Sequence, residues 1–207
     1  MLDTELVRAS KGGGQRLMIL LHGLGDSMEG YRWLPEAMAL PWLNYLLVNA
    51  PGAYYGGFSW YDFHQDPGKD IDASRRLIFE LLDSLREKNF PSRETMLLGF
   101  SQGCLMSIEA GARYPHRLAG IVGISGYAHE PERLALELSP EAREQRFLLT
   151  HGTQDPLIPI EQVRPQVELL RRAGLNIEWH EFVKGHTIAG EQELGVVRDF
   201  IQKCYNS

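Results

Sequence analysis

The stretch Gly99–Gly103, with the sequence G-F-S-Q-G, indicates the fold more clearly than any other part of the chain. It follows the apolar run Thr95–Leu98, which has the composition of a buried strand, and it precedes a segment of helical spacing, Cys104–Tyr114. A strand that enters a G-x-S-x-G turn and continues as a helix is typical of a nucleophile elbow, which exposes a serine side chain at the strand end. The pentapeptide alone is a moderate signal, so its meaning depends on the segments around it.

Apolar segments of strand type and of helix type alternate along the whole sequence. The expected strands are Thr4–Ala9, Arg16–His22, Tyr45–Asn49, Thr95–Leu98, Leu118–Ser125, Arg146–Thr150 and Asn176–Val183. The expected helices are Asp70–Asn89, with Asp70 as its N-cap, then Cys104–Tyr114, Glu161–Ala173 and a last helix with Leu194, Val197 and Ile201 on one face. The alternation predicts an α/β protein with a mainly parallel central sheet flanked by helices, and a single domain over residues 1–207.

Composition and charge exclude several classes of function. Of the 207 residues 43% are hydrophobic and 23% are charged, which is ordinary for a globular protein. The net charge is −6 and basic residues form no long run, so no nucleic-acid partner is expected. No apolar run is long enough for stable membrane insertion. Residues 1–14 lack the apolar core of a signal peptide, and the two cysteines form no disulfide framework, which predicts a cytoplasmic location.

Three residues with the chemistry of a serine nucleophile and its activating groups follow three of the expected strands. A serine hydroxyl becomes a nucleophile when a histidine accepts its proton and a carboxylate orients that histidine. Enzymes with this elbow carry them in the chain order Ser, Asp or Glu, His, and the sequence offers Ser101, Asp155 and His186. Taken alone, an aspartate like Asp155 is more often part of a cap or a turn, and a histidine like His186 is more often part of a turn. Because the carboxyl ends of parallel strands meet at one edge of a sheet, we expect the three side chains to lie together.

Backbone N–H groups suited to bind an oxyanion are expected at two places. The first is the N–H of Gln102, directly after the serine and at the start of a helix. The second lies in the glycine-rich loop after the strand Arg16–His22, where the N–H of Gly23, Leu24 or Gly25 could serve. With the three side chains, these donors predict acyl transfer through a serine ester.

Five motifs spread over the chain resemble those of the phospholipase/carboxylesterase family, which includes acyl-protein thioesterases. They are L-H-G-L-G-D (Leu21–Asp26), P-G-A-Y-Y-G-G-F-S-W-Y-D (Pro51–Asp62), G-F-S-Q-G (Gly99–Gly103), H-G-T-Q-D-P-L-I-P (His151–Pro159) and G-H-T-I (Gly185–Ile188). The resemblance implies an α/β-hydrolase fold without a large lid domain. It also implies a catalytic triad of Ser101, Asp155 and His186, with Leu24 and Gln102 as the oxyanion donors.

The resemblance further implies a substrate and a place where it binds. The substrate is a small-molecule acyl ester or thioester, and the expected protein is a serine carboxylesterase that hydrolyses short- to medium-chain acyl esters through an acyl-enzyme intermediate. The aromatic segment 53–67, with Phe58 and Trp60, is expected to form one wall of the acyl pocket, and Leu157 with Ile158 another. Core packing is the alternative for each of these side chains. The family also allows a homodimer.

Two other functions and one departure from the family pattern stay open. The alternatives are acyl-protein thioesterase or lysophospholipase activity on fatty acyl chains and, from a different class, a catalytically silent hydrolase-like binding protein. No cofactor is expected, and no metal either, because Lys184 stands where a zinc motif that begins at His180 needs its second histidine. The family elbow continues with a second glycine, and here Cys104 replaces it, as an expected buried and inert thiol.

Overall fold

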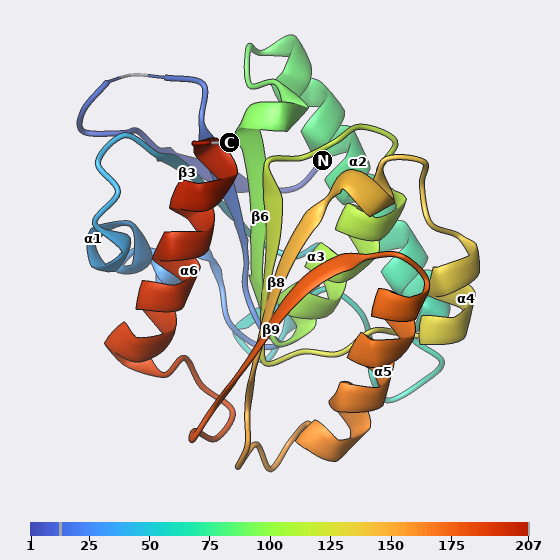
Figure 1. Ribbon diagram of the computed structural model, residues 1–207. Coiled ribbons are helices and arrows are strands. Elements are labelled where there is room, and N and C mark those ends of the chain that lie inside the picture. Colours follow the sequence, from blue (N-terminus) through green and yellow to red (C-terminus); the bar gives the residue numbers. More distant parts are fainter. Residues whose placement is uncertain (13, 207) are drawn as a thin grey trace.

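A seven-stranded sheet organises the computed structural model, which describes residues 1–12 and 14–206 (Figure 1). The strands are β1 (Thr4–Val7), β2 (Leu17–Leu21), β3 (Asn44–Val48), β6 (Thr95–Phe100), β7 (Gly120–Ile124), β8 (Arg146–Gly152) and β9 (Asn176–Phe182), in the spatial order β1-β3-β2-β6-β7-β8-β9. Strand β1 is antiparallel to β3, and the remaining neighbours are parallel. The carboxyl ends of the parallel strands therefore meet at one edge of the sheet, the lower edge in Figure 1.

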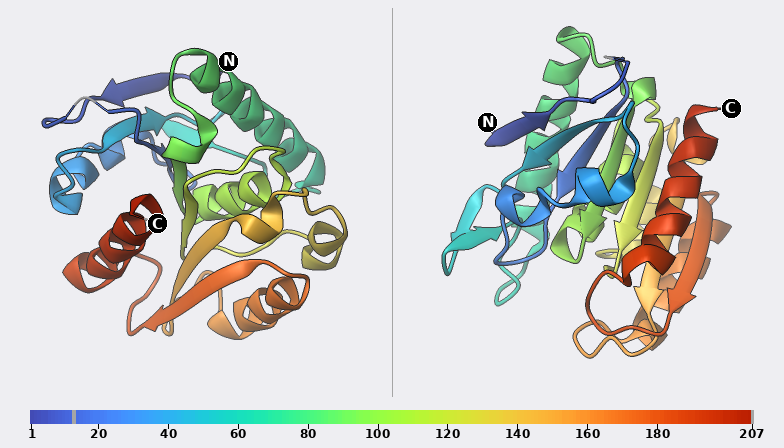
Figure 2. Two further views of the ribbon diagram at one scale, coloured as in Figure 1. Left: turned by 45° about the horizontal axis from the view of Figure 1, so that its top comes forward. Right: turned by 90° about the vertical axis from the view of Figure 1, so that its left-hand side faces the viewer.

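Helices cover both faces of this sheet (Figure 2). One face carries α1 (Leu34–Met38) and α6 (Gly190–Tyr205), and the other carries α2 (Gly68–Glu87), α3 (Gln102–Arg113), α4 (Pro131–Leu136) and α5 (Ile160–Arg172). Short 3-10 turns lie at Met28–Tyr31, Ser92–Glu94 and Ala142–Glu144. Within the described part of the chain, none of the helices has both the length and the apolar character needed to cross a membrane.

The strand β2 shows why the central segments are apolar throughout. Leu17, Ile19 and Leu21 pack on the side of α2 to α5, whereas Met18 and Leu20 pack on the side of α1 and α6. All five side chains are at most 2% exposed. A strand covered on both faces has no polar face, so its sequence shows no alternation.

The structure confirms the mainly parallel sheet flanked by helices, with strand ends that lie within a few residues of the expected ones. The expected N-cap of the longest helix is wrong. Helix α2 begins at Gly68 after Pro67, and Asp70 lies inside its first turn. The Asp70 carboxylate accepts the N–H of Asp62 at 3.1 Å, so it stabilises the preceding segment and does not cap its own helix.

A hairpin lies within the aromatic segment 53–67, where the sequence predicts no regular structure. Strand β4 (Gly52–Tyr54) pairs with β5 (Gly57–Ser59), and the connecting residues Tyr55 and Gly56 have φ of 43° and 91°. Two-residue hairpin turns of this kind usually carry Asn or Gly at the first position, because φ is positive there. With tyrosine at that position, the usual sequence signal is missing.

Helix α3 starts in direct backbone contact with the sheet. A Cβ atom on Gly99 would lie 1.9 Å from the Gly103 carbonyl oxygen, and one on Gly103 would lie 1.9 Å from the Leu21 carbonyl oxygen. Both positions therefore require glycine.

Cys104 fills the space that two further glycines leave open. A Cβ atom on Gly123 or on Gly126 would lie 2.6 Å from the Cys104 sulfur. The Cys104 side chain is 2% exposed, and burial raises the pKa of its thiol to about 12. The thiol is thus neutral and enclosed, and glycines opposite the helix provide the room that the extra sulfur needs.

Replacing Gly123 by alanine tests this packing. We expect Gly123→Ala to lower the free energy of unfolding by about 1–3 kcal/mol, because the new methyl group overlaps the Cys104 sulfur. Adding Cys104→Gly should restore part of the loss, and urea unfolding measures both effects. Gly195→Ala is the matched control, since a Cβ atom there meets nothing within 4 Å. Strictly additive effects of the two substitutions would contradict the packing role.

Candidate active site

Three polar side chains meet at the carboxyl edge of the sheet. Ser101 follows β6, Asp155 follows β8 and His186 follows β9. The His186 Nδ1 lies 2.7 Å from Asp155 Oδ2, and its Nε2 lies 2.9 Å from Ser101 Oγ. Because an ionised carboxylate only accepts hydrogen bonds, Nδ1 carries the proton of the neutral ring, and Nε2 accepts the hydroxyl proton of Ser101. The structure thus joins Ser101, His186 and Asp155 in one hydrogen-bonded chain.

Ser101 is held in a backbone conformation that L-residues rarely adopt. Its φ is 55° and its ψ is −116°. Its N–H donates to the Ile124 carbonyl at 3.0 Å, and its carbonyl accepts the N–H groups of Cys104 and Leu105 at 3.0 and 3.2 Å. Such strain persists only where the surroundings fix the residue, and it is concentrated at functional sites.

The Asp155 carboxylate is buried and has a complete set of donors. Its Oδ1 accepts the N–H groups of Leu157 and Ile158, each at 2.9 Å, while Oδ2 accepts from His186. Burial raises the pKa of Asp155, but the N–H groups and the His186 ring outweigh this effect, and the pKa lies below its usual value. Asp155 is therefore an anion that orients the His186 ring.

A second histidine, which the sequence analysis did not single out, supports the turn that carries Asp155. His151 is fully buried and donates from Nε2 to the Ile158 carbonyl at 2.9 Å. The same nitrogen lies 3.6 Å from Asp155 Oδ2, and burial lowers the pKa of His151. The neutral ring of His151 thus stabilises the turn 155–158 through its hydrogen bond to Ile158.

The backbone N–H groups of the glycine-rich loop after β2 differ in whether they have a hydrogen-bond acceptor. The N–H of Gly25 donates to the Phe58 carbonyl at 2.8 Å, whereas the N–H of Gly23 lies near the Tyr31 hydroxyl but makes no hydrogen bond to a described residue. Among the residues that the structure describes, no acceptor is found for the N–H of Leu24. The N–H of Gln102 is the first of α3, where helix donors have no intrahelical partner.

The Gln102 side chain connects the elbow to the segment that follows β5. Its Oε1 accepts the Trp60 N–H at 2.9 Å and the Ser59 hydroxyl at 3.2 Å, and its Nε2 donates to the Tyr61 carbonyl at 2.9 Å. The Trp60 indole then donates to the His22 carbonyl at 2.9 Å. The elbow and the glycine-rich loop are therefore linked through one largely buried network.

The His22 ring fixes the start of that loop. Its Nδ1 donates to the Gly23 carbonyl at 2.6 Å, and its Nε2 accepts the Ala50 N–H at 3.1 Å. Burial lowers the pKa of His22 against the opposing effect of the Gly23 carbonyl. A neutral histidine thus has both nitrogens bonded at a position where the sequence analysis assigned no role.

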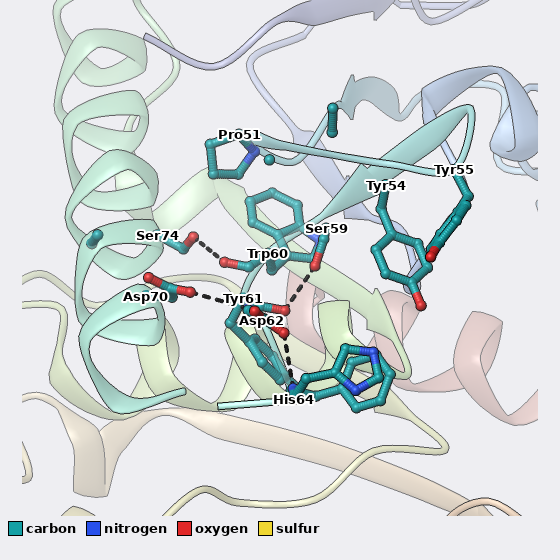
Figure 3. A pocket seen from close by; sticks show the side chains of 14 residues that line it. Pro51, Tyr54, Tyr55, Ser59, Trp60, Tyr61, Asp62, His64, Asp70 and Ser74 are labelled. Atoms are coloured by element: carbon teal, nitrogen blue, oxygen red, sulfur yellow. Dashed lines mark hydrogen bonds between the residues drawn. The ribbon is translucent and has the colours of Figure 1, made fainter. Parts of the chain in front are cut away.

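The side chains expected around the acyl group lie in different environments. Trp60 is 1% exposed and lines a cleft of about 490 Å³ beside the hairpin (Figure 3). Phe58 and Ile158 are partly buried against the core, whereas Leu157 is 71% exposed. A separate cavity of about 310 Å³ borders His186, with Trp33, Phe100, Ile188 and Tyr31 among its walls. The sequence analysis assigned none of these residues to a wall, because they come from segments far apart in the chain.

The sequence matches the phospholipase/carboxylesterase family over residues 2–205. The chain belongs to this family. It is 36% identical to acyl-protein thioesterase 1 of Schizosaccharomyces pombe over 159 residues, 69% of each chain. It is 28% identical to acyl-protein thioesterase 1 of Debaryomyces hansenii over 223 residues, 97% of this chain and 96% of the relative. The structure of esterase PE8 is similar with a TM-score of 0.85 and 26% identity, covering 98% of this chain and 99% of that one.

Membership in the phospholipase/carboxylesterase family confirms two predictions from the motifs. The fold is that of an α/β-hydrolase with no large lid evident in the described residues, and the chain is an esterase-type hydrolase. Residues 1–12 and 14–206 contain no group of three or more His, Cys, Asp or Glu side chains placed to hold a metal ion.

A buried ion pair closes the loop that carries His186 in this family member. The Lys184 Nζ lies 2.6 and 2.8 Å from the two carboxylate oxygens of Glu193, and both side chains are at most 3% exposed. Glu193 also accepts the Ala189 N–H at 2.6 Å and the Thr150 hydroxyl at 2.5 Å. Burial lowers the pKa of Lys184, and Glu193 opposes that shift. One carboxylate thus anchors the loop on both sides of His186.

Removal of the lysine charge tests this anchor. We expect Lys184→Met to lower the free energy of unfolding by about 3–5 kcal/mol, because it leaves the Glu193 carboxylate buried without a counter-ion. Adding Glu193→Gln should recover much of the loss, since it removes the second charge and keeps an acceptor. Chemical denaturation measures both. The control is Lys203→Met, at an exposed position of α6, the helix that carries Glu193. It should change stability by about 0.5 kcal/mol or less. Equal stability of the two lysine variants would exclude the anchoring role.

Proposed function

We propose that the chain is a serine carboxylesterase that hydrolyses short- to medium-chain acyl esters through an acyl-enzyme intermediate. The observation that carries the proposal is the hydrogen-bonded chain from Ser101 through His186 to Asp155 at the carboxyl edge of the sheet. In this proposal Ser101 is the nucleophile, His186 the general base and acid, and Asp155 the orienting carboxylate. The family of ester hydrolases to which the chain belongs supports the assignment.

The reaction proceeds in two halves. The Ser101 Oγ attacks the acyl carbonyl carbon while His186 Nε2 takes the hydroxyl proton, and the carbonyl oxygen becomes an oxyanion. When the tetrahedral intermediate collapses, the bond to the leaving oxygen breaks and His186 returns its proton to that oxygen. Water then attacks the acyl-Ser101 ester with the same base, and the carboxylic acid product leaves. Asp155 stabilises the His186 imidazolium that forms in each half.

The proposed oxyanion donors are the N–H groups of Gln102 and Leu24. The Gln102 N–H follows the nucleophile at the start of α3, where the helix dipole also favours negative charge. In the glycine-rich loop the N–H of Gly25 already has a partner, which leaves those of Gly23 and Leu24, and the family to which the chain belongs supports Leu24 as the second donor. Such a donor contributes roughly 3–4 kcal/mol to the stabilisation of the transition state.

The cavity beside His186 is the proposed site of one substrate group, with Trp33, Phe100 and Ile188 as its apolar walls. Phe58, Leu157 and Ile158 remain proposed acyl contacts on the loops around Ser101, as does Trp60, although Trp60 is almost fully enclosed. We also propose that residues 1–207 act as one domain, that the protein is cytoplasmic, and that the chain can form a homodimer. The contribution of β1 and β9 to the same sheet supports the single domain.

Acyl-protein thioesterase activity is the second candidate, because relatives that match most of the chain carry that name. Both candidates use the same nucleophile and differ in the length of acyl chain and in the leaving atom. The catalytically silent alternative differs from both, because its serine would not react with a fluorophosphonate probe.

Loss of the nucleophile is the first test. Ser101→Ala should abolish hydrolysis of p-nitrophenyl butyrate and labelling by a fluorophosphonate, because the covalent intermediate cannot form. Ser84→Ala on α2, remote from the carboxyl edge of the sheet, is the matched control and should retain full activity. Retained turnover in the Ser101→Ala variant would contradict the assignment of Ser101 as the nucleophile.

Acyl length separates the two enzymatic candidates. We expect kcat/KM to be highest for p-nitrophenyl acetate, butyrate or octanoate and to be lower for palmitate, because an added methylene contributes up to about 0.8 kcal/mol only while the protein covers it. Matched thioesters of each acid give the preference for the leaving atom. A maximum at palmitate, with thioesters preferred, would favour the acyl-protein thioesterase.

A further inference from the structure

A cleft of about 490 Å³ lies apart from the triad, between the β4–β5 hairpin and the first turns of α2 (Figure 3). Neither Ser101 nor His186 borders it. Of its lining residues, the proposed ester hydrolysis assigns a role only to Trp60. Two features of that lining, one aromatic and one acidic, point to a ligand.

Aromatic rings form one side of the cleft. The Tyr54 and Tyr55 rings meet edge to face, with centroids 4.9 Å apart and planes at 86°, and the Phe63 ring lies 6.4 Å from Tyr54. In an edge-to-face pair the ring that contributes its edge keeps its faces open. Tyr55 is 96% exposed, so its ring offers a face to a bound molecule, whereas Phe63 is 47% exposed and has the His64 ring against it, with centroids 4.0 Å apart.

The Tyr55 backbone is strained without an evident gain for the fold. Its φ of 43° belongs to a turn position where Asn or Gly is preferred, and its ring is left in solvent. An aromatic residue there costs conformational energy and buries little apolar surface in return. Strain that the fold does not require is a reason to look for a role in binding.

Carboxylates face this aromatic side. Asp70 Oδ2 accepts the Asp62 N–H at 3.1 Å, and Asp62 Oδ1 accepts the His64 N–H at 2.8 Å. Each carboxylate thus uses one oxygen to hold the segment and has a second oxygen free of hydrogen bonds among the described residues. Of the described residues that line the cleft, none is lysine or arginine. The local charge is therefore negative.

We propose that this cleft binds a small organic ammonium cation. Aromatic faces attract a cation through their quadrupole, most strongly when the cation is methylated and weakly hydrated, and the carboxylates of Asp62 and Asp70 add a long-range attraction. A neutral molecule of the same shape would gain only the apolar contact. The site is distinct from the triad, so it can be tested whether or not the chain hydrolyses esters.

The test compares choline with its neutral isostere 3,3-dimethylbutan-1-ol. Each is titrated into the full-length protein, with Ser101→Ala as a second sample, and dissociation constants are taken from backbone amide shifts in NMR spectra. We expect choline to bind about tenfold more tightly than the alcohol, with shifts centred on residues 54–63. Sodium chloride at equal ionic strength is the reference. Ethanolamine distinguishes the two sources of the charge: equal binding assigns the site to ammonium ions in general, and weaker binding assigns it to methylated ones.

Two variants test the proposed contacts separately. Tyr55→Asn suits the positive φ and should fold at least as well as the parent, yet it should weaken choline binding several-fold, by about the value of one cation–π contact. Asp70→Asn keeps an oxygen for the Asp62 N–H and should reduce the preference for choline over the alcohol. Leu136→Asn, at an exposed apolar position on α4, is the control.

The proposal is overturned if choline and the alcohol bind equally. It is likewise overturned if the choline shifts lie outside residues 51–74, which line the cleft, or if Tyr55→Asn and Asp70→Asn bind choline as the parent does. Because no step of this test uses turnover, a failure here and a failure of ester hydrolysis can be told apart.

Discussion

The contact of backbone with backbone at the start of α3 is the constraint on which the site depends. Since Gly99 and Gly103 leave no room for a side chain, the helix begins at a fixed distance from β2 and β6. That distance forces Ser101 into its strained conformation and directs the first N–H groups of α3 toward the space above it. The position of the proposed nucleophile and that of the proposed oxyanion donor are thus set by one packing requirement.

Buried polar groups hold the surrounding loops at that edge. His22 fixes the glycine-rich loop, His151 braces the turn of Asp155, and the pair of Lys184 with Glu193 closes the loop of His186. Buried polar groups cost free energy unless their hydrogen bonds are satisfied, and the Nδ1 of His151 has no partner among the described residues. These groups therefore stabilise a specific arrangement more than the fold as a whole. Each of these loops carries proposed site residues and has its own support, which contacts the sheet or a helix.

The α/β fold and the meeting of Ser101, Asp155 and His186 could be predicted from sequence because they depend on local patterns: apolar runs, chain order and strand ends. The hairpin could not, since Tyr55 replaces the usual turn residue. The pairing of Lys184 with Glu193 depends on how α6 approaches β9, which no local pattern encodes. That the N–H of Gly25 is already used by the Phe58 carbonyl could not be predicted from the sequence either. The sequence places Trp60 in an aromatic segment without regular structure, and it does not reveal that the side chain is almost fully buried.

The bonds of Gln102 have a mechanical consequence. The segment Ser59–Tyr61 lines the ammonium cleft on one side and is bonded three times to the Gln102 amide on the other. It cannot shift without breaking bonds to the residue next to the nucleophile. An ionised glutamate at position 102 could not donate to the Tyr61 carbonyl, and a hydrocarbon side chain of the same size would leave the backbone N–H of Trp60 buried without an acceptor. Tolerance to mutation at position 102 is therefore limited by its side chain, whereas its backbone N–H would survive many substitutions.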